Sequence, residues 1–398
     1  MNWLALGATA CGSVVLTEIL RDTYHALCHH IPALERWHNR HHAAYRRDLS
    51  VVSLAAFRRS QLYHDITEST ILLVILLIIA LLTRALGVWV GVVYAGLFLA
   101  GAIRRYVWAV TDTDYNHQPG PLREPPTAWW VNRTYHWRHH FDNVHAYYSG
   151  VFPLVDKVLG TGLSLQGKKV GVTGAGGALG QALCAELQRA GAQVTALTTH
   201  PECLAAASQL QVVGWDIGRE AELAPLLATL DILVINHGVN VYRRRDFAAI
   251  ETALSVNTLS VLKLMELFMN TVTGPEAKAT KELWVNTSEA EVSPALSPLY
   301  ELSKRLIGNL VTLKRLDNVC VIRKLILGPF KSQLNPYGVM SPQWVAKGII
   351  ALAKRDFRNI IITVNPLTYI FFPLKEFTTS LYYRCCSRGE RPDLTLLG

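Results

Sequence analysis

Long apolar stretches dominate the first 110 residues of the chain. Residues 3–20 are almost wholly apolar, and residues 71–82 and 85–103 are separated only by Thr83 and Arg84. A membrane-spanning helix needs about 20 mostly apolar residues, so the third stretch qualifies alone and the second qualifies once residues 66–70 are added. The pattern predicts one entry helix followed by a tight helical hairpin. A signal peptide is disfavoured, because the first stretch has neither a basic leader nor a small-residue cleavage site.

From Lys168 onward, short β-branched runs alternate with segments of helical length, which is typical of βαβ units and a parallel sheet. We therefore expect an α-helical integral membrane domain over residues 1–163 and an α/β Rossmann-type doubly wound parallel sheet over residues 164–358. Residues 359–398 should hold a last strand and an apolar aromatic tail. For that tail, attachment at the membrane interface is favoured over packing on the membrane domain. The expected strands cover residues 170–173, 194–197, 212–215, 232–235, 283–286 and 319–325.

Composition agrees with a membrane setting. Half of the residues are hydrophobic and 17% are charged, below the roughly 25% of soluble proteins, and the mean hydropathy is +0.20. Lys and Arg number 39 against 30 Asp and Glu, and many arginines lie beside apolar runs, so a membrane surface is favoured and nucleic acid is not expected as a partner. With three crossings, Arg21, residues 46–59, Arg104 and Arg105 share one side, which the positive-inside tendency assigns to the cytoplasm. The seven cysteines form no CxxC pair, which disfavours a zinc ribbon or a disulfide framework.

Twelve of the 14 histidines precede residue 146, and nine of them form three clusters. Residues three or four apart share a helix face, so each cluster directs two or three imidazoles at one point. Nine imidazoles exceed the four ligands of a structural zinc site, which favours a dinuclear centre. All clusters lie on the expected cytoplasmic side. The candidate metal ligands are His25, His29, His30, His38, His41, His42, His117, His136, His139 and His140.

Three histidines stand apart from the clusters, and each is either a ligand, a residue that supports the ligands, or a residue at the membrane interface: His64, His117 and His145. Three carboxylates are candidates to orient the ligands by hydrogen bonds: Asp22, Asp114 and Asp142.

The motifs HALCHH, HNRHH and HWRHH resemble the three histidine boxes of the fatty acid hydroxylase/sterol desaturase superfamily. The segment FPLVDKVLGT is similar to the end of such domains, and the resemblance covers residues 10–163. It implies two iron ions that activate O2, hydroxylation or desaturation of a lipid C–H bond, and an external electron donor. The first box carries a doubled histidine, so the resemblance leaves open whether His29 or His30 is the ligand. It also leaves open whether a fourth membrane helix, found in some relatives, is present.

A glycine-rich turn follows the first expected strand of the second half, at Gly174, Gly176, Gly177 and Gly180. Such a strand-to-helix turn lets the backbone approach a pyrophosphate at the helix N-terminus. After the second strand no acid is present at residues 198–200 to bind a ribose hydroxyl, which favours NADP over NAD, although no arginine stands there either.

Three further residues are expected to line the nucleotide site: Asp216 near the adenine amine, and Asn236 and Gly238 after the fourth strand.

Tyr300 and Lys304 are four residues apart, so on a helix the ammonium group can lower the pKa of the phenol. The phenol can then exchange a proton with substrate while hydride passes to or from a nicotinamide. Ser288 is the candidate to hold the substrate oxygen, and Asn257 to position Lys304 through water.

With the glycine turn, these residues resemble the short-chain dehydrogenase/reductase superfamily over residues 168–355. The sequence departs from that pattern at Ala178, His237 and the Gly328–Pro329 pair.

The whole layout resembles bifunctional sterol desaturase/short-chain dehydrogenase proteins. It implies a membrane lipid oxidoreductase in which the di-iron half oxidises a C–H bond and the other half interconverts an alcohol and a carbonyl. A likeness to plant aldehyde-decarbonylase-type wax enzymes supports an alternative, the conversion of an aldehyde to an alkane. A second alternative is a membrane scaffold with two inactive halves. The residues do not choose among sterols, acyl chains and carotenoids as substrate, and they do not indicate an oligomeric state.

Overall fold

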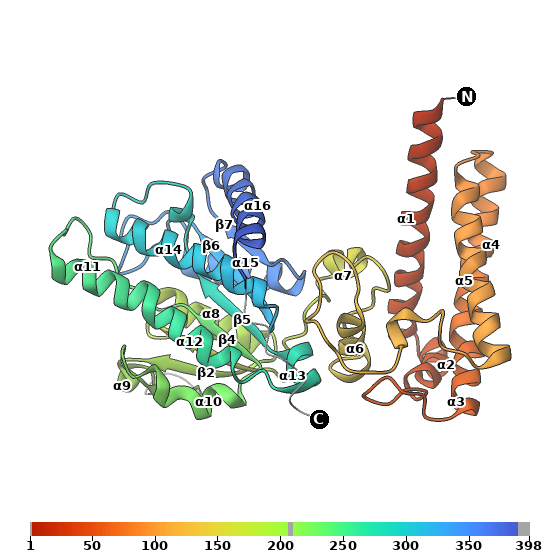
Figure 1. The fold of residues 1–398 in the computed structure, drawn as a ribbon, viewed down its shortest axis with the longest axis horizontal. Coiled ribbons are helices and arrows are strands. Elements are labelled where there is room, and N and C mark those ends of the chain that lie inside the picture. The colour runs from red at the N-terminus through yellow and green to blue at the C-terminus, as the bar shows by residue number, and fades with distance from the viewer. Residues whose placement is uncertain (1, 206–209, 389–398) are drawn as a thin grey trace. The chain divides into compact units, whose positions relative to one another are not determined.

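The computed structural model describes residues 2–205 and 210–388. The chain divides into two compact units, Met1–Leu163 and Ser164–Gly398. The first unit is helical, and the second is built on a parallel sheet (Figure 1).

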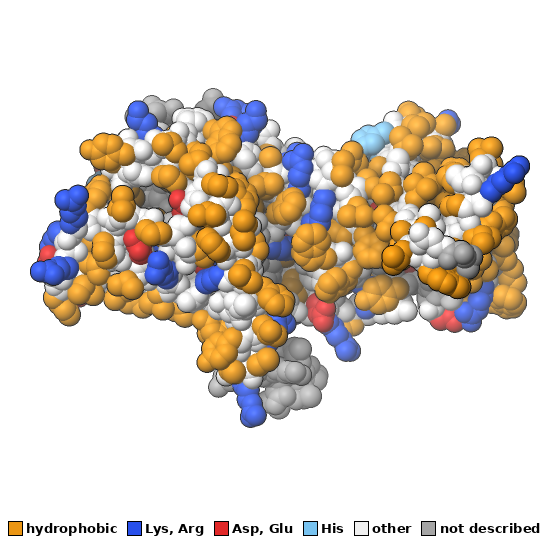
Figure 2. All heavy atoms as spheres, turned by 90° about the horizontal axis from the view of Figure 1, so that it is seen from above, with side chains coloured by type: hydrophobic (Ala, Val, Ile, Leu, Met, Phe, Trp, Pro, Cys, Tyr) orange, Lys and Arg blue, Asp and Glu red, His pale blue; other side chains and the backbone are white. Residues whose placement is uncertain are grey.

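Three long apolar helices form the frame of the first unit. They are α1 (Trp3–Cys28), the continuous helix Leu54–Thr83 made of α3 (Leu54–Ser60), η1 (Gln61–Asp65) and α4 (Ile66–Thr83), and α5 (Val88–Trp108). Each is long and apolar enough to cross a membrane, which confirms the predicted entry helix and hairpin. The α5 backbone approaches α1 closely, because Ser13 Oγ donates to the Gly87 carbonyl and accepts from the Gly91 amide. Exposed apolar side chains cover the outer faces of these helices, and Figure 2 shows hydrophobic side chains over much of the visible face of each unit.

Short elements at one end of this frame carry most of the histidines. The helix α2 (Pro32–His42) begins with a proline, whose missing N–H is unneeded in a first helical turn. The Asn132 side chain caps α6 (Arg133–Phe141) by accepting from the Tyr135 amide. The remaining short elements are η2 (Tyr115–His117) and α7 (Leu154–Leu159).

The second unit holds a seven-stranded parallel sheet of order β3-β2-β1-β4-β5-β6-β7. The order reverses between β1 and β4, the point where doubly wound sheets bind ligands. The predicted fold class is therefore confirmed, with strand ends within two residues of those expected. The strands are β1 (Lys169–Thr173), β2 (Gln193–Thr198), β3 (Gln211–Gly214), β4 (Ile232–Ile235), β5 (Glu282–Asn286), β6 (Val321–Leu327) and β7 (Asn359–Ile362).

Helices cover both faces of this sheet (Figure 1). The helix Phe247–Met269 is also long and apolar enough to cross a membrane, but Val261, Leu264 and Phe268 on it are buried in the core with β4 and β5. Its apolar face therefore belongs to the Rossmann unit. The covering elements are α8 (Ala178–Arg189), α9 (Pro201–Ala205), η3 (Glu220–Leu223), α10 (Ala224–Thr229), α11 (Phe247–Leu254), η4 (Ser255–Ser260), α12 (Val261–Met269), α13 (Gly274–Thr280), η5 (Glu289–Glu291), α14 (Pro298–Lys314), η6 (Arg315–Asp317) and α15 (Pro342–Lys354).

The aromatic segment after β7 forms the helix α16 (Thr368–Cys386), which packs on the Rossmann unit. The Glu376 carboxylate accepts from Lys324 Nζ at 2.7 Å and from Arg315 Nη1 at 2.9 Å, and Phe372 is fully buried. A buried, paired charge cluster thus fixes this helix. Its attachment to a membrane interface stays a prediction, and residues 389–398 of the same segment lie outside the described residues.

Candidate active sites: a histidine cluster and a nucleotide-binding site

Nine histidines converge in the first unit as two adjacent groups. Within each group, one ring nitrogen per residue lies within 4.8 Å of all the others, and every histidine except the partly buried His42 is buried. The groups adjoin, since the His42 and His140 ring centroids are 4.5 Å apart. The first histidine group comprises His25, His29, His38, His42 and His139, and the second comprises His41, His117, His136 and His140.

Two helices contribute to both groups. On α2, His38 and His42 face the first group while His41 faces the second. On α6, His139 joins the first group, and His136 and His140 join the second. This follows from spacings of three and four residues on a helix, and it fixes the two groups side by side.

Backbone carbonyls orient two of these rings. His25 Nδ1 donates to the Tyr148 carbonyl at 2.7 Å, and His139 Nδ1 donates to the Ala146 carbonyl at 2.8 Å. Both carbonyls lie in a turn that Asp156 holds, because its carboxylate accepts from the amides of Tyr148 and Ser149. Asp156 was not among the expected site residues, although its motif, VDKVLGT, carried part of the family resemblance.

The three expected orienting carboxylates have different partners. Asp114 Oδ1 lies 2.8 Å from His117 Nδ1, as expected of an orienting acid. Asp22 accepts from the Gly150 amide, and Asp142 accepts from the Tyr147 hydroxyl.

The histidines that the sequence left open take different places. His64 is buried on the π-helical turn η1, with its Nδ1 3.1 Å from His38 Nδ1, and it forms a third set with Cys28 and His38. Such turns occur often at functional sites. His30 departs from the expectation of a ligand: it is exposed and outside both groups, because it lies one residue beyond the position that shares the face of His25. His145 is exposed as well.

Burial keeps the clustered imidazoles neutral. Desolvation, with smaller contributions from neighbouring histidines, lowers the pKa of His29 to about 3. Desolvation likewise lowers the pKa of His139 to about 4, against the opposing effect of its bond to Ala146. Metal ligands must be deprotonated imidazoles, so the donor set fits two cations of the kind that prefer nitrogen.

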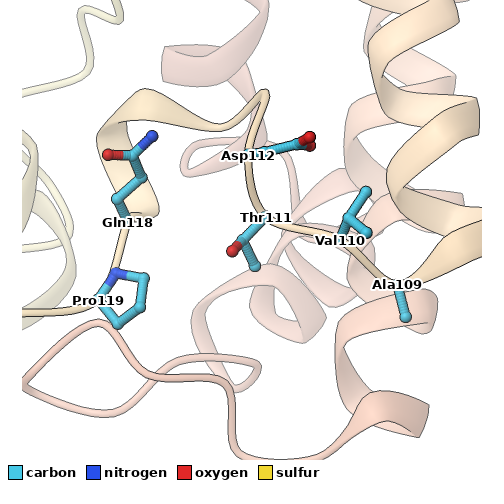
Figure 3. Close-up of a pocket in the computed structure, with 6 residues that line it drawn as sticks. All are labelled: Ala109, Val110, Thr111, Asp112, Gln118 and Pro119. Carbon is cyan, nitrogen blue, oxygen red and sulfur yellow. The ribbon is translucent and has the colours of Figure 1, made fainter.

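A surface pocket of the same unit lies along the segment that leads from α5 to η2 and past it (Figure 3). None of the grouped histidines lines it, although Gln118 in its wall directly follows His117. Its lining residues are Ala109, Val110, Thr111, Asp112, Gln118 and Pro119.

In the second unit, the glycine turn lies between β1 and α8. Gly174 has a φ of +62°, and a Cβ there would lie 2.8 Å from the His237 Cα. A Cβ on Gly180 would overlap the Gly174 carbonyl oxygen, and one on Gly176 would lie 3.0 Å from Thr198 Oγ1. Gly177 is the N-cap of α8. The turn leaves backbone amides open at a helix N-terminus, which fits a pyrophosphate.

The other expected nucleotide residues gather at the carboxyl edge of the sheet. Asp216 is exposed after β3, and Asn236 Oδ1 accepts from Asn286 Nδ2 at 2.9 Å. A Cβ on Gly238 would lie 3.2 Å from Asn257 Oδ1. His237, which the sequence pattern did not explain, has Nδ1 2.9 Å from Thr173 Oγ1, and burial beside Lys304 lowers its pKa to about 4.

The expected catalytic residues lie together at this edge. Ser288 lies beside Tyr300, and burial raises the pKa of the Tyr300 phenol against the opposing effect of the Ser288 side chain. Lys304 Nζ donates to the Asn286 carbonyl at 3.0 Å and lies 5.8 Å from the centre of the Tyr300 ring. Burial lowers the pKa of Lys304 to about 8.

Asn257 lies on a second π-helical turn, η4. Its amide donates to the Val239 carbonyl and to Ser303 Oγ, and its Oδ1 accepts from the Val239 amide. It therefore fastens the segment after β4 to the residue that precedes Lys304.

Comparison with known proteins identifies the second unit. Residues 168–313 match the family model of short chain dehydrogenases. Among solved structures, a short chain dehydrogenase from Burkholderia cenocepacia in complex with NADP is 18% identical, with a TM-score of 0.47 over 57% of this chain and 100% of the other. Aldohexose dehydrogenase from Thermoplasma acidophilum is 17% identical, with a TM-score of 0.43 over 52% of this chain and 95% of the other. The family-model match over residues 168–313 confirms the expected short-chain dehydrogenase domain.

One relative matches both units. The monoglucosyldiacylglycerol epimerase of Synechocystis sp. is 51% identical over 412 aligned positions, which cover 98% of this chain and 99% of the relative. The match extends through the histidine-bearing unit as well as the Rossmann unit. The chain therefore belongs to the family of the Synechocystis monoglucosyldiacylglycerol epimerase.

Proposed function

We propose that the Rossmann unit epimerises the sugar headgroup of a membrane glycolipid of the monoglucosyldiacylglycerol class. The observation that carries this proposal is the grouping of Ser288, Tyr300 and Lys304 beside the glycine turn. The name of the full-length relative supplies the substrate class and the outcome of the reaction.

Inversion at a carbinol carbon requires its C–H bond to break and to form again on the opposite face. A bound nicotinamide cofactor supplies a reversible hydride acceptor for such a carbon. Tyr300 takes the hydroxyl proton as the carbinol becomes a ketone, and returns it to the same oxygen when the ketone is reduced from its other face. Ser288 holds that oxygen, and the Lys304 ammonium lowers the pKa of the phenol during the transfer. The reaction is redox-neutral and consumes no oxidant.

The cofactor proposed is NADP or NAD, with NADP favoured. Gly174, Gly176, Gly177 and Gly180 would hold its pyrophosphate, because a side chain at three of these positions would close the turn. Residues 198–200 at the end of β2 present threonines and a histidine rather than an acid that would bind a ribose hydroxyl.

For the first unit we propose a dinuclear iron centre held by the two histidine groups. A second candidate function, O2-dependent hydroxylation or desaturation of a lipid with electrons from an external donor, is favoured by the number of neutral imidazoles beside membrane spans. When bound, the two iron ions would activate O2, which is the oxidant of that reaction and takes its further electrons from the external donor. The arginines near the ends of the spans favour the cytoplasmic side for both sites.

Purified full-length protein in lipid nanodiscs containing monoglucosyldiacylglycerol tests both functions. Epimerase activity should convert the headgroup to its epimer, detected by sugar analysis, with catalytic NADP and without O2. Absence of an epimer with both NADP and NAD would contradict the proposal. The second function would instead require O2 and yield a lipid with an added oxygen or a new double bond.

A further inference from the structure

We propose that the rim of the Rossmann active site docks onto an anionic lipid bilayer. The rim is defined as the loops of residues 239–245, 294–297 and 331–340. This inference rests on the proposed function, since it supplies the route by which a lipid headgroup reaches Tyr300 while its acyl chains stay in the membrane.

Hydrogen bonds join the three loops around the site. Ser297 Oγ contacts Asn240 Oδ1 at 2.7 Å and the Tyr242 carbonyl at 3.0 Å, and the Tyr242 hydroxyl donates to the Gln333 carbonyl at 3.3 Å. Ser297 directly precedes α14, on which Tyr300 lies. The loops therefore form one connected surface beside the catalytic tyrosine.

The tips of these loops present apolar side chains to the outside. Leu296 is 90% exposed, Tyr337 93% and Val339 68%. Leu296 and Tyr242 also have φ values of +54° and +53°, a backbone conformation that is unfavourable for bulky L-residues. The fold thus holds Leu296 in a strained turn with its side chain almost fully exposed, and Tyr242 in a second strained turn with its ring half exposed. Such strain is a mark of functional surfaces.

Basic residues accompany the apolar tips. Arg243, Arg244, Arg245 and Lys331 are exposed in the same loops, and Asp246 pairs with Arg244 at 2.8 Å. Aromatic and aliphatic tips beside arginines match the boundary of an anionic bilayer, where the apolar groups enter the interface and the cations meet lipid phosphates.

Two observations favour a lipid bilayer, rather than a protein partner, as what the rim contacts. The chain carries three candidate spans in its first unit, so the second unit is tethered at a membrane. The apolar surface also continues past the rim, because Asn365 Nδ2 contacts Ser293 Oγ at 3.2 Å. The exposed residues Val364 and Leu367 flank this contact just before α16, and Ile370 is exposed in its first turn.

Depth measurements test the docking directly. The experiment uses full-length protein in which the seven native cysteines are replaced. Tyr337→Cys introduces a single cysteine that carries a nitroxide, and the labelled protein is placed in nanodiscs containing phosphatidylglycerol. Docking predicts greater relaxation by O2 than by a water-soluble nickel chelate. The matched control is Gln193→Cys, at the exposed start of β2 on the amino edge of the sheet, which should favour the nickel chelate. The proposal would be overturned if both nitroxides were relaxed more strongly by the nickel chelate than by O2, as in water. Protection of the Tyr337→Cys nitroxide from both reagents would also overturn it, because such protection indicates a protein partner or a second copy.

Enzyme turnover with membrane-bound and water-soluble substrates provides a second test of the docking. Tyr337→Asp should lower turnover of monoglucosyldiacylglycerol in nanodiscs about tenfold, because it removes an interfacial contact and adds repulsion from anionic lipid. It should leave turnover of a water-soluble short-chain analogue unchanged, and Tyr337→Phe should preserve both activities. Equal loss with both substrates would overturn docking. If the unaltered protein turned over neither substrate, the proposed function would fail while the probe measurement still decided the docking.

Discussion

The Nε2 atoms of His25 and His139 lie 2.9 Å apart although 114 residues separate them in the sequence. Both Nδ1 atoms donate to backbone carbonyls, so both Nε2 atoms carry lone pairs that face each other. Two acceptors at this distance repel unless a cation lies between them. The arrangement therefore supports the proposed metal ion at this point rather than an internal hydrogen bond between the two rings.

His139→Ala should lower the metal content of the purified protein, measured by elemental mass spectrometry, from about two ions per chain to about one or fewer. Its ring lies within hydrogen-bond distance of both His25 and His29, so its removal opens the first histidine group. His30→Ala is the matched control, because His30 is exposed and outside both groups. Equal metal loss in the two variants would contradict the assignment of the first group.

Tyr300→Phe should abolish proton transfer while leaving the fold and cofactor affinity intact. The loss expected for a general acid–base residue is about 10²–10⁴-fold in turnover. Tyr382→Phe serves as the control, since Tyr382 is 63% exposed on α16. Cofactor affinity measured by fluorescence should be unchanged in both variants. Residual turnover close to that of the unaltered protein would exclude Tyr300 as the proton carrier.

The pH dependence of turnover should show a falling limb near the lowered Lys304 pKa of about 8. Above that pH the side chain loses its proton and no longer lowers the pKa of Tyr300. Stability should change in the opposite direction to turnover. Between pH 8 and the ordinary lysine pKa of 10.5, the unfolded chain binds more protons at Lys304 than the folded chain does. The contribution of Lys304 to the free energy of unfolding therefore rises with pH in this range. In Lys304→Arg the falling limb should move to higher pH, because the guanidinium stays charged. If turnover fell at the same pH in the unaltered protein and in Lys304→Arg, the falling limb would belong to a group other than Lys304.

The fold was predictable from the sequence because its signals are local. Apolar runs marked α4 and α5, and β-branched runs marked each strand of the sheet. Helix Phe247–Met269 shows the limit: its composition alone suits a membrane, and only packing against β4 and β5 assigns it to the sheet.

The site was predictable where the spacing of histidines along a helix determines which way their side chains point. His38, His41 and His42 follow helical geometry and lie as their spacing indicates. The role of His64 was left open and Asp156 was missed as a site residue, because a π-helical turn and a carboxylate that binds amides of a distant turn have no periodic signature. The doubled histidine at 29 and 30 could not be resolved until the end of α1 was known.

The glycine turn offers a matched pair of substitutions. In Gly180→Ala the new Cβ would overlap the Gly174 carbonyl oxygen, a backbone atom that cannot move without opening the turn. In Gly177→Ala the Cβ would lie 3.4 Å from the same oxygen, an ordinary contact. Gly180→Ala should therefore weaken NADP binding at least about tenfold and destabilise the unit by about 1–3 kcal/mol, the usual cost of overpacking. Gly177→Ala should change both little. Titration calorimetry and thermal unfolding measure the two effects, and equal affinities in the pair would show that this turn does not hold the pyrophosphate.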